Sequence, residues 1–156
     1  MNEREQHLVV DLLTNQRIAS LAVEVDERPF VSLVPFAAAA DFDTFLIHAS
    51  ALATHSRGLT AGARYALLIH QPDTRTDSNP AQLARITLQG RVEPLGRSAD
   101  SYGAAKDLYL AKFPQSEITF QLGDFTLYAL TVESCRLVAG LARTFDLTPA
   151  DLAELS

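Results

Sequence analysis

The feature that most constrains the fold is a series of short apolar runs with a two-residue period, separated by turn-forming residues. The run over residues 17–25 is followed by the turn Asp26-Glu27-Arg28-Pro29 and a second run over residues 30–37, which together predict a hairpin. Further strands are predicted over residues 42–48, 64–70, 85–94, 125–134 and 136–141. Consecutive short strands joined by turns favour an antiparallel barrel over a parallel sheet with crossover helices.

Three segments have helical spacing of their apolar residues: 3–15, 98–112, which stops before Phe113-Pro114, and 149–155 with Thr148 as N-cap. The order is therefore one helix, a meander of about five strands, one helix, two strands and a short terminal helix. This order predicts a mainly β chain with flanking helices, forming a single domain over residues 1–156. Residues 71–84 are rich in Pro, Asp, Thr, Ser and Asn, and we expect them to form an exposed loop.

The charge and cysteine content exclude several classes of protein. A net charge of −6 argues against general affinity for nucleic acid or an anionic membrane, so any bound anion needs a local cluster of donors. Cys135 is the only cysteine, which excludes an internal disulfide, and its strand-like surroundings predict a buried structural thiol. The first residues are polar, and the apolar run 8–13 is short and interrupted by Asp11, so we expect a cytoplasmic protein.

The densest group of chemically active side chains lies in residues 48–58. It contains two imidazoles, three hydroxyls and a guanidinium: His48, Ser50, Thr54, His55, Ser56 and Arg57. Hydroxyls and backbone amides beside an arginine are what a phosphate monoester needs. A polar loop whose hydroxyls cap a helix explains the same composition, and the residues alone leave both interpretations open. The spacing of the two histidines matches no recognised metal site, so no metal is expected.

Two arginines outside this segment, Arg85 and Arg143, fall at predicted strand ends near the expected mouth of a barrel. No nucleophile elbow, P-loop or G-x-G-x-x-G motif is present. The sequence therefore identifies no catalytic residue.

Several sequence motifs, in their order along the chain, resemble those of the pyridoxamine 5′-phosphate oxidase-like FMN-binding split barrels, and within them those of the HugZ-type haem-utilisation branch. The resemblance spans residues 8–147. The motifs are Arg17-Ile-Ala-Ser-Leu-Ala, Arg28-Pro-Phe-Val-Ser-Leu-Val-Pro-Phe, Leu52-Ala-Thr-His-Ser-Arg, Leu83-Ala-Arg-Ile-Thr-Leu-Gln-Gly-Arg-Val-Glu, Tyr109-Leu-Ala-Lys-Phe-Pro-Gln, Leu122-Gly-Asp-Phe-Thr-Leu-Tyr and Leu137-Val-Ala-Gly-Leu-Ala-Arg-Thr-Phe.

The resemblance implies a homodimer with two FMN molecules lodged between the subunits and a small-molecule substrate. It implies that Ser32, Leu33 and Val34 lie along the flavin ring on a central strand. Residues of the segment 48–57 hold the cofactor, with the phosphate at Ser50, His55, Ser56 and Arg57 and with His48 beside them. Arg85 lies near the flavin, and Arg143 reaches across the subunit interface.

The chain also departs from the oxidases of this family. Gly58 stands where they carry a second cation, Ser32 where they carry an arginine, and Val138 where they carry a tryptophan. No histidine follows His70 to ligate haem iron as in the haem degraders of the family. The prediction is therefore an FMN-dependent oxidoreductase acting on an unknown small molecule. The alternatives are a haem-binding or haem-degrading protein without flavin, a non-enzymatic flavin carrier or sensor, and a purely structural barrel.

Overall fold

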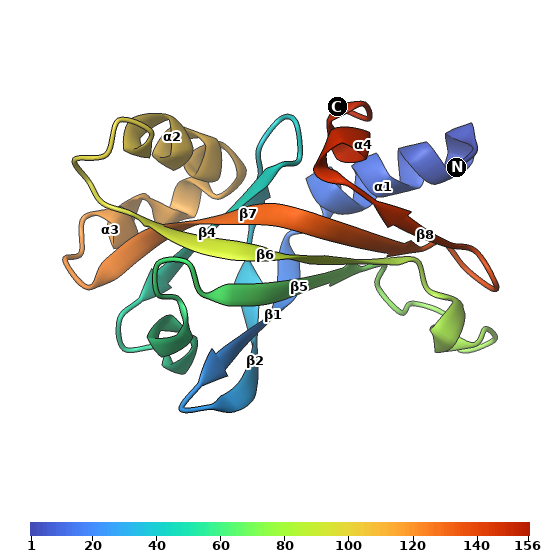
Figure 1. Cartoon of the computed structure of the whole chain (residues 1–156), viewed down its shortest axis with the longest axis horizontal. Coiled ribbons are helices and arrows are strands. Elements are labelled where there is room, and N and C mark those ends of the chain that lie inside the picture. The colour runs from blue at the N-terminus through green and yellow to red at the C-terminus, as the bar shows by residue number, and fades with distance from the viewer.

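Eight strands form one antiparallel sheet in the spatial order β2-β1-β5-β6-β7-β4-β3, with β8 paired to β7. The computed structural model describes residues 1–156 (Figure 1). The strands are β1 (Ile18–Val25), β2 (Arg28–Pro35), β3 (Ala37–Ala38), β4 (Thr44–Ser50), β5 (Arg64–His70), β6 (Arg85–Leu95), β7 (Phe125–Val138) and β8 (Thr144–Leu147). The prediction of a mainly β, antiparallel chain with flanking helices is confirmed.

The predicted simple meander is wrong in two respects, because β2 and β4 are not neighbours and β4 and β5 are not neighbours. β4 pairs with β7, and β5 pairs with β1. The 3-10 helix η1 (Thr54–Gly58) lies in the connection between β4 and β5, which changes the chain's place in the sheet. This connection is the segment that the sequence singled out for its polar side chains.

The last long strand was predicted as two, but β7 is continuous over 14 residues. The reason is a bulge within β7 itself, where the register with β6 shifts and leaves Glu133 as the extra residue between Val132, opposite Gly90, and Ser134, opposite Gln89. The shift leaves Glu133 and Ser134 both exposed on β7, so the two-residue period breaks without ending the strand. β8, which pairs with the end of β7, was not predicted.

The main core lies on one face of the curled sheet and is closed by α1 (Glu3–Asn15). This helix buries Val9, Leu12 and Leu13 completely, as its spacing predicted. Each such side chain contributes about 1.5–3 kcal/mol of burial free energy. Asn2 and Glu5 form a capping box that fixes the start of the helix. Cys135 is buried in the same core, as predicted.

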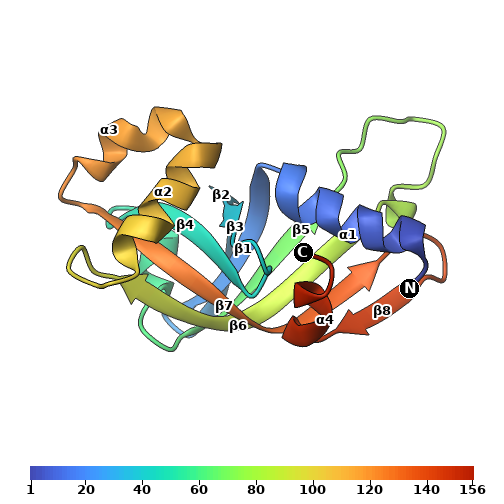
Figure 2. The same cartoon turned by 90° about the horizontal axis from the view of Figure 1, so that it is seen from above.

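A second, smaller cluster covers the other face of β4 and β7, where α2 (Tyr102–Lys112), η3 (Pro114–Ser116) and α3 (Glu117–Phe120) pack. Figure 2 shows α2 and α3 towards one end of the molecule and α1 towards the other. The predicted helix 98–112 begins only at Tyr102, because residues 98–101 form a turn.

The terminal helix α4 (Pro149–Ala153) is capped by Thr148, as predicted. Within the predicted loop 71–84, the only regular element is the 3-10 helix η2 (Pro80–Gln82). No helix combines the length and the apolar character needed to span a bilayer.

Candidate functional site

The polar segment after β4 folds back onto the hairpin of β1 and β2. A hydrogen bond of 2.9 Å joins Ser32 Oγ on β2 to His55 Nδ1 in η1. Two residues that the sequence placed in one site are thus brought into contact across 23 positions of the chain.

The other ring nitrogen of this imidazole, His55 Nε2, is the one buried side-chain N or O atom without a hydrogen-bond partner. Leaving a buried polar atom unpaired costs about 1–3 kcal/mol. Burial also lowers the pKa of His55, because the surroundings disfavour the charged imidazolium. The imidazole is therefore kept neutral, and one of its two nitrogens is buried without a partner in this chain.

Ser50 and Ser56 hold the segment in shape. Ser50 Oγ donates to Asp124 Oδ2 at 2.8 Å and accepts from the amide of Leu52 at 3.1 Å. Ser56 Oγ donates to the carbonyl of Ser50 at 2.7 Å. Both hydroxyls are therefore used to hold the segment, within itself and against Asp124 before β7, which is the structural interpretation that the composition had left open for them.

Arg57 is more than half exposed and forms an ion pair with Asp26 in the turn between β1 and β2. Both turn residues, Asp26 and Glu27, have positive φ angles of 51° and 59°, as a two-residue hairpin turn requires. Sequence reasoning missed Asp26 as the partner, because the two residues lie 31 positions apart.

A groove of about 520 Å³ lies between this turn and η1. Its lining combines the cations Arg28 and Arg57, the hydroxyl of Thr54, the carboxylate of Asp26 and an apolar wall of Val25, Pro29 and Phe30. Two guanidinium groups against one carboxylate leave the groove with a positive local charge in an acidic chain. We call it the η1 groove.

Gly58, where the resembling oxidases carry a cation, has a packing reason for its identity. A Cβ at this position would lie 2.5 Å from the carbonyl oxygen of Glu24 and 2.9 Å from Cβ of Val23. The close approach of η1 to β1 leaves no room for any side chain here.

His48 faces away from this groove, into the α2–α3 cluster. Its ring stacks on Phe120, with centroids 3.8 Å apart and an interplanar angle of 6°, and its Nδ1 lies 3.2 Å from Thr119 Oγ1. Desolvation, together with the nearby charge of Arg97, lowers the pKa of His48 to about 4. His48 is therefore neutral near pH 7 and joins two elements of the fold.

The three residues Ser32, Leu33 and Val34 do not share a face. Ser32 contacts η1, Leu33 is 65% exposed on the outer face, and Val34 is buried in the core. Their strand, β2, lies at the edge of the sheet, so the expectation of a central strand is wrong. Its only paired neighbour is β1, since the chain places β2 at one end of the strand order.

Arg85 and Arg143 lie at the opposite end of β6 and β7 from η1 (Figure 1). The two ends are separated by roughly 40 Å along β7, from the rise per residue of a strand. Arg85 donates to the carbonyls of Ala81 and Leu83, and Arg143 Nε donates to Glu5 Oε1 at 2.7 Å. Within one chain, these arginines are not part of the η1 groove.

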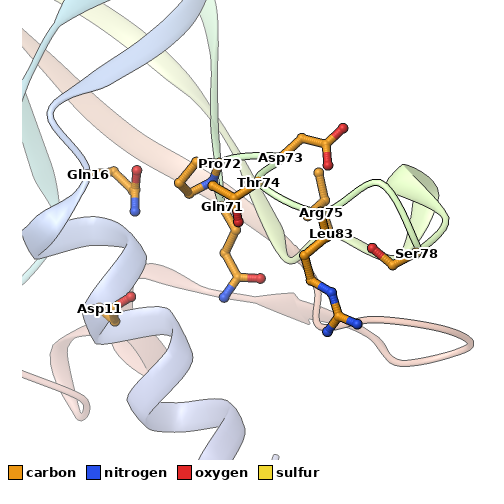
Figure 3. Close-up of a pocket in the computed structure, with 9 residues that line it drawn as sticks. All are labelled: Asp11, Gln16, Gln71, Pro72, Asp73, Thr74, Arg75, Ser78 and Leu83. Atoms are coloured by element: carbon orange, nitrogen blue, oxygen red, sulfur yellow. The ribbon is translucent and has the colours of Figure 1, made fainter.

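A separate pocket of about 320 Å³ lies between α1 and the loop 71–84 (Figure 3). Gln71 and Arg75 project into it opposite Asp11 of α1, and most of its lining residues are polar, with Pro72 and Leu83 as the exceptions. Arg75 is already held by two hydrogen bonds to Asp77. None of the predicted site residues lines this pocket. No group of three or more His, Cys, Asp or Glu side chains is arranged to hold a metal ion.

The backbone is similar to those of several solved structures. A protein from Clostridium acetobutylicum, related to general stress protein 26 and described as of the pyridoxine-phosphate oxidase family, superposes with a TM-score of 0.69. It is 14% identical and covers 97% of this chain and 99% of its own. The chain has the split-barrel fold of the pyridoxamine 5′-phosphate oxidase-like proteins. The fold that the sequence motifs implied is therefore confirmed.

Two further split barrels come from Mycobacterium smegmatis. A haem-binding protein matches with a TM-score of 0.80 and 24% identity over 99% of this chain, which spans 61% of that protein's length. A FAD- and haem-binding protein matches with a TM-score of 0.64 and 22% identity, over 99% of this chain and 78% of its own. No sequence-family model and no curated protein sequence matches the chain.

Proposed function

We propose that this split barrel binds FMN and uses it as a flavin-dependent oxidoreductase on a small molecule, as a cytoplasmic homodimer. The observation that carries the proposal is the contact between β2 and η1, where the Ser32–His55 hydrogen bond leaves His55 Nε2 unpaired, two residues before Arg57 in the same 3-10 helix. The fold supports a flavin, since one split barrel with this backbone is described as binding FAD together with haem.

The η1 groove fits the phosphate end of the cofactor. Arg57 uses one side of its guanidinium on Asp26 and keeps further N–H donors for an anion, while Thr54 adds a hydroxyl. Arg28 adds a second cation to the same groove. A bound flavin supplies the hydride chemistry, and the residues of the groove hold and orient it. No side chain of the chain is assigned as acid or base.

The homodimer has support in the outer face of the sheet. Val31 and Leu33 on β2 are 62% and 65% exposed, and they lie beside Ala22 and Ser20 of β1. A contiguous exposed apolar face of this kind is typical of an interaction surface. Arg85 and Arg143 are too far along the same chain to reach the η1 groove, and only a second copy could bring them there.

The test is a titration of the purified protein with FMN, in which binding is monitored through the quenching of flavin fluorescence. The Arg57→Ala variant is expected to bind FMN more weakly by about 1.5–3 kcal/mol, roughly 10- to 150-fold, because a charge-assisted hydrogen bond is lost. Arg136→Ala is the matched control, since Arg136 is equally exposed and forms an ion pair with Asp146 far from η1. Equal FMN affinity of wild type and Arg57→Ala contradicts the assignment of the phosphate.

Haem is the second candidate ligand, because the split barrels from M. smegmatis are both described as haem-binding. In this chain His7 of α1 is exposed and lines a groove of about 670 Å³ together with Arg4 and Arg143. A Soret band that forms on adding hemin and is lost in His7→Ala supports haem. Flavin absorption bands that persist in the purified protein support FMN, and flavin that no reductant can reduce supports a carrier or sensor.

A further inference from the structure

Two cations without acidic partners lie close together where α1 ends and α2 ends. Arg17 connects α1 to β1, and Lys112 is the last residue of α2. Both lie against the ring of Phe113, with Arg17 Cζ 5.4 Å and Lys112 Nζ 5.9 Å from its centroid. Neither forms an ion pair, although six other cations of the chain do.

The charge of Lys112 is energetically unfavourable, because the ammonium group is partly removed from water and has no acidic partner. Its ammonium donates to the carbonyl of Gln16 at 2.6 Å and lies 4.2 Å from the centroid of the buried Phe36 ring. Desolvation, and then repulsion by Arg17, lower the pKa of Lys112 to about 8. Removing a charge from water is unfavourable unless an opposite charge compensates it, and none of the six ion pairs of this chain includes Lys112.

A groove of about 540 Å³ opens beside these cations. Arg17 lines it together with the amide side chains of Asn15, Gln16 and Gln115 and the hydroxyl of Ser116. Its other walls are the apolar surfaces of Ile18, Pro35 and Phe113. In Figure 2, β2 and β3 lie between the end of α1 and the α2–α3 unit.

This lining combines a cationic end with hydrogen-bond donors and an apolar wall. A guanidinium is suited to the paired oxygens of a carboxylate or a phosphate. The positive field of Lys112 acts on the same place, because Lys112 is bonded to Gln16 in the groove lining. The apolar wall favours a ligand whose charged group is attached to a hydrocarbon or aromatic body.

We propose that the groove at Arg17 and Lys112 is a binding site for a small organic anion. Its oxyanion group contacts Arg17, and its apolar body packs on Phe113, Ile18 and Pro35. This site shares no lining residue with the η1 groove, so it does not depend on flavin binding.

The experiment is a calorimetric titration of the full chain at pH 7 and low salt with benzoate, phenyl phosphate and neutral benzyl alcohol. At least one anion is expected to bind, with benzyl alcohol at least tenfold weaker. The Arg17→Gln variant is expected to lose tenfold or more in affinity for that anion, and Lys112→Gln is expected to weaken it as well. The preferred anion identifies the head group as carboxylate or phosphate.

Two variants serve as controls for the place of binding. Arg136→Gln, an exposed arginine on β7, is expected to leave the affinity unchanged. Arg57→Ala distinguishes the two grooves. If Arg57→Ala loses phenyl phosphate binding while Arg17→Gln keeps it, the anion binds in the η1 groove and the proposal is overturned. Binding of neither anion, or equal binding of benzyl alcohol, also overturns it. Arg17 is exposed at the surface, so its replacement tests the site even if a Lys112 variant fails to fold.

Discussion

At position 58, the backbone of η1 comes so close to β1 that a Cβ atom would overlap the carbonyl oxygen of Glu24. From the sequence, Gly58 was only a missing cation at an expected phosphate site. In the structure Gly58 has a packing role, because the absence of a side chain lets η1 approach the hairpin that carries Ser32 and Asp26. The cation that the resembling oxidases place here could not fit, and Arg28 from the hairpin lines the same groove.

This residue gives a direct test of packing. Gly58→Ala is expected to lower the free energy of unfolding by about 1–3 kcal/mol, the usual cost of overpacking a tight site. Gly103→Ala is the matched control, since Gly103 lies inside α2 with nothing within 4 Å of the added Cβ. That variant is expected to gain about 0.5–1 kcal/mol from helix propensity. Urea denaturation measures both, and equal stability of Gly58→Ala and wild type contradicts the packing argument.

At the level of single residues, the sequence predicted the polar segment of the site but not the residues that contact it. The polar segment 48–58 was recognised from local composition, and its place between two strands was predicted. Its partners were not, because Asp26 and Asp124 come from distant parts of the chain and no local pattern identifies them. His48 belongs to the same sequence segment, but the alternation of side chains along β4 directs its ring into the α2–α3 cluster.

At the scale of elements, most strands were predictable because one face of each is buried and the two-residue period is therefore regular. The prediction failed where pairing over a long distance decides the outcome. The bulge at Glu133 breaks the two-residue period within β7, and it depends on the register with β6. The short β8 and α3 depend on packing against finished elements, since neither is long enough to be stable alone.

The packing of α3 on β4 through His48 is expected to be sensitive to acid. The unfolded chain has a His48 pKa near 6.5 and the folded one about 4, so between these values the unfolded chain binds more protons. The free energy of unfolding should therefore fall as the pH drops through this window. The half-exposed ring reduces the contribution to about 1–2 kcal/mol through solvent screening.

The check is urea denaturation at several pH values between 7 and 4. His48→Phe keeps the stack on Phe120 and should lose less unfolding free energy as the pH falls. Part of the pH dependence should remain, because the pKa of His55 is also lowered in the folded chain. His70→Phe changes an exposed histidine and should retain the wild-type profile. A His48→Phe profile identical to wild type would show that this imidazole does not couple the two elements to pH.

At the scale of the whole molecule, the sheet has two very different surfaces. Its inner face is filled by the core and α1, while the outer face of β1, β2 and β5 presents apolar and small residues with no helix over them. Leu68 of β5 lies opposite Ser20, and Leu33 of β2 lies on the other side of that same Ser20. The fold thus leaves one broad apolar surface unpaired, and it is the surface on which the proposed homodimer depends.

Leu33→Asp is the variant that tests this surface, because Leu33 is 65% exposed and its replacement costs the single chain little burial. In wild type, light scattering after size-exclusion chromatography is expected to give twice the chain mass of 17.0 kDa. In Leu33→Asp, the mass should fall towards that of one chain, since a carboxylate would be desolvated at the centre of the interface. Ile118→Asp is the control, since Ile118 is 66% exposed on α3, which packs on β4 and β7 and lies away from this face. A monomeric wild type contradicts the proposed homodimer, and a Leu33→Asp variant that stays dimeric places the interface on another surface. If the dimer also completes the flavin site, FMN affinity should decline together with the dimer in Leu33→Asp while remaining intact in Ile118→Asp.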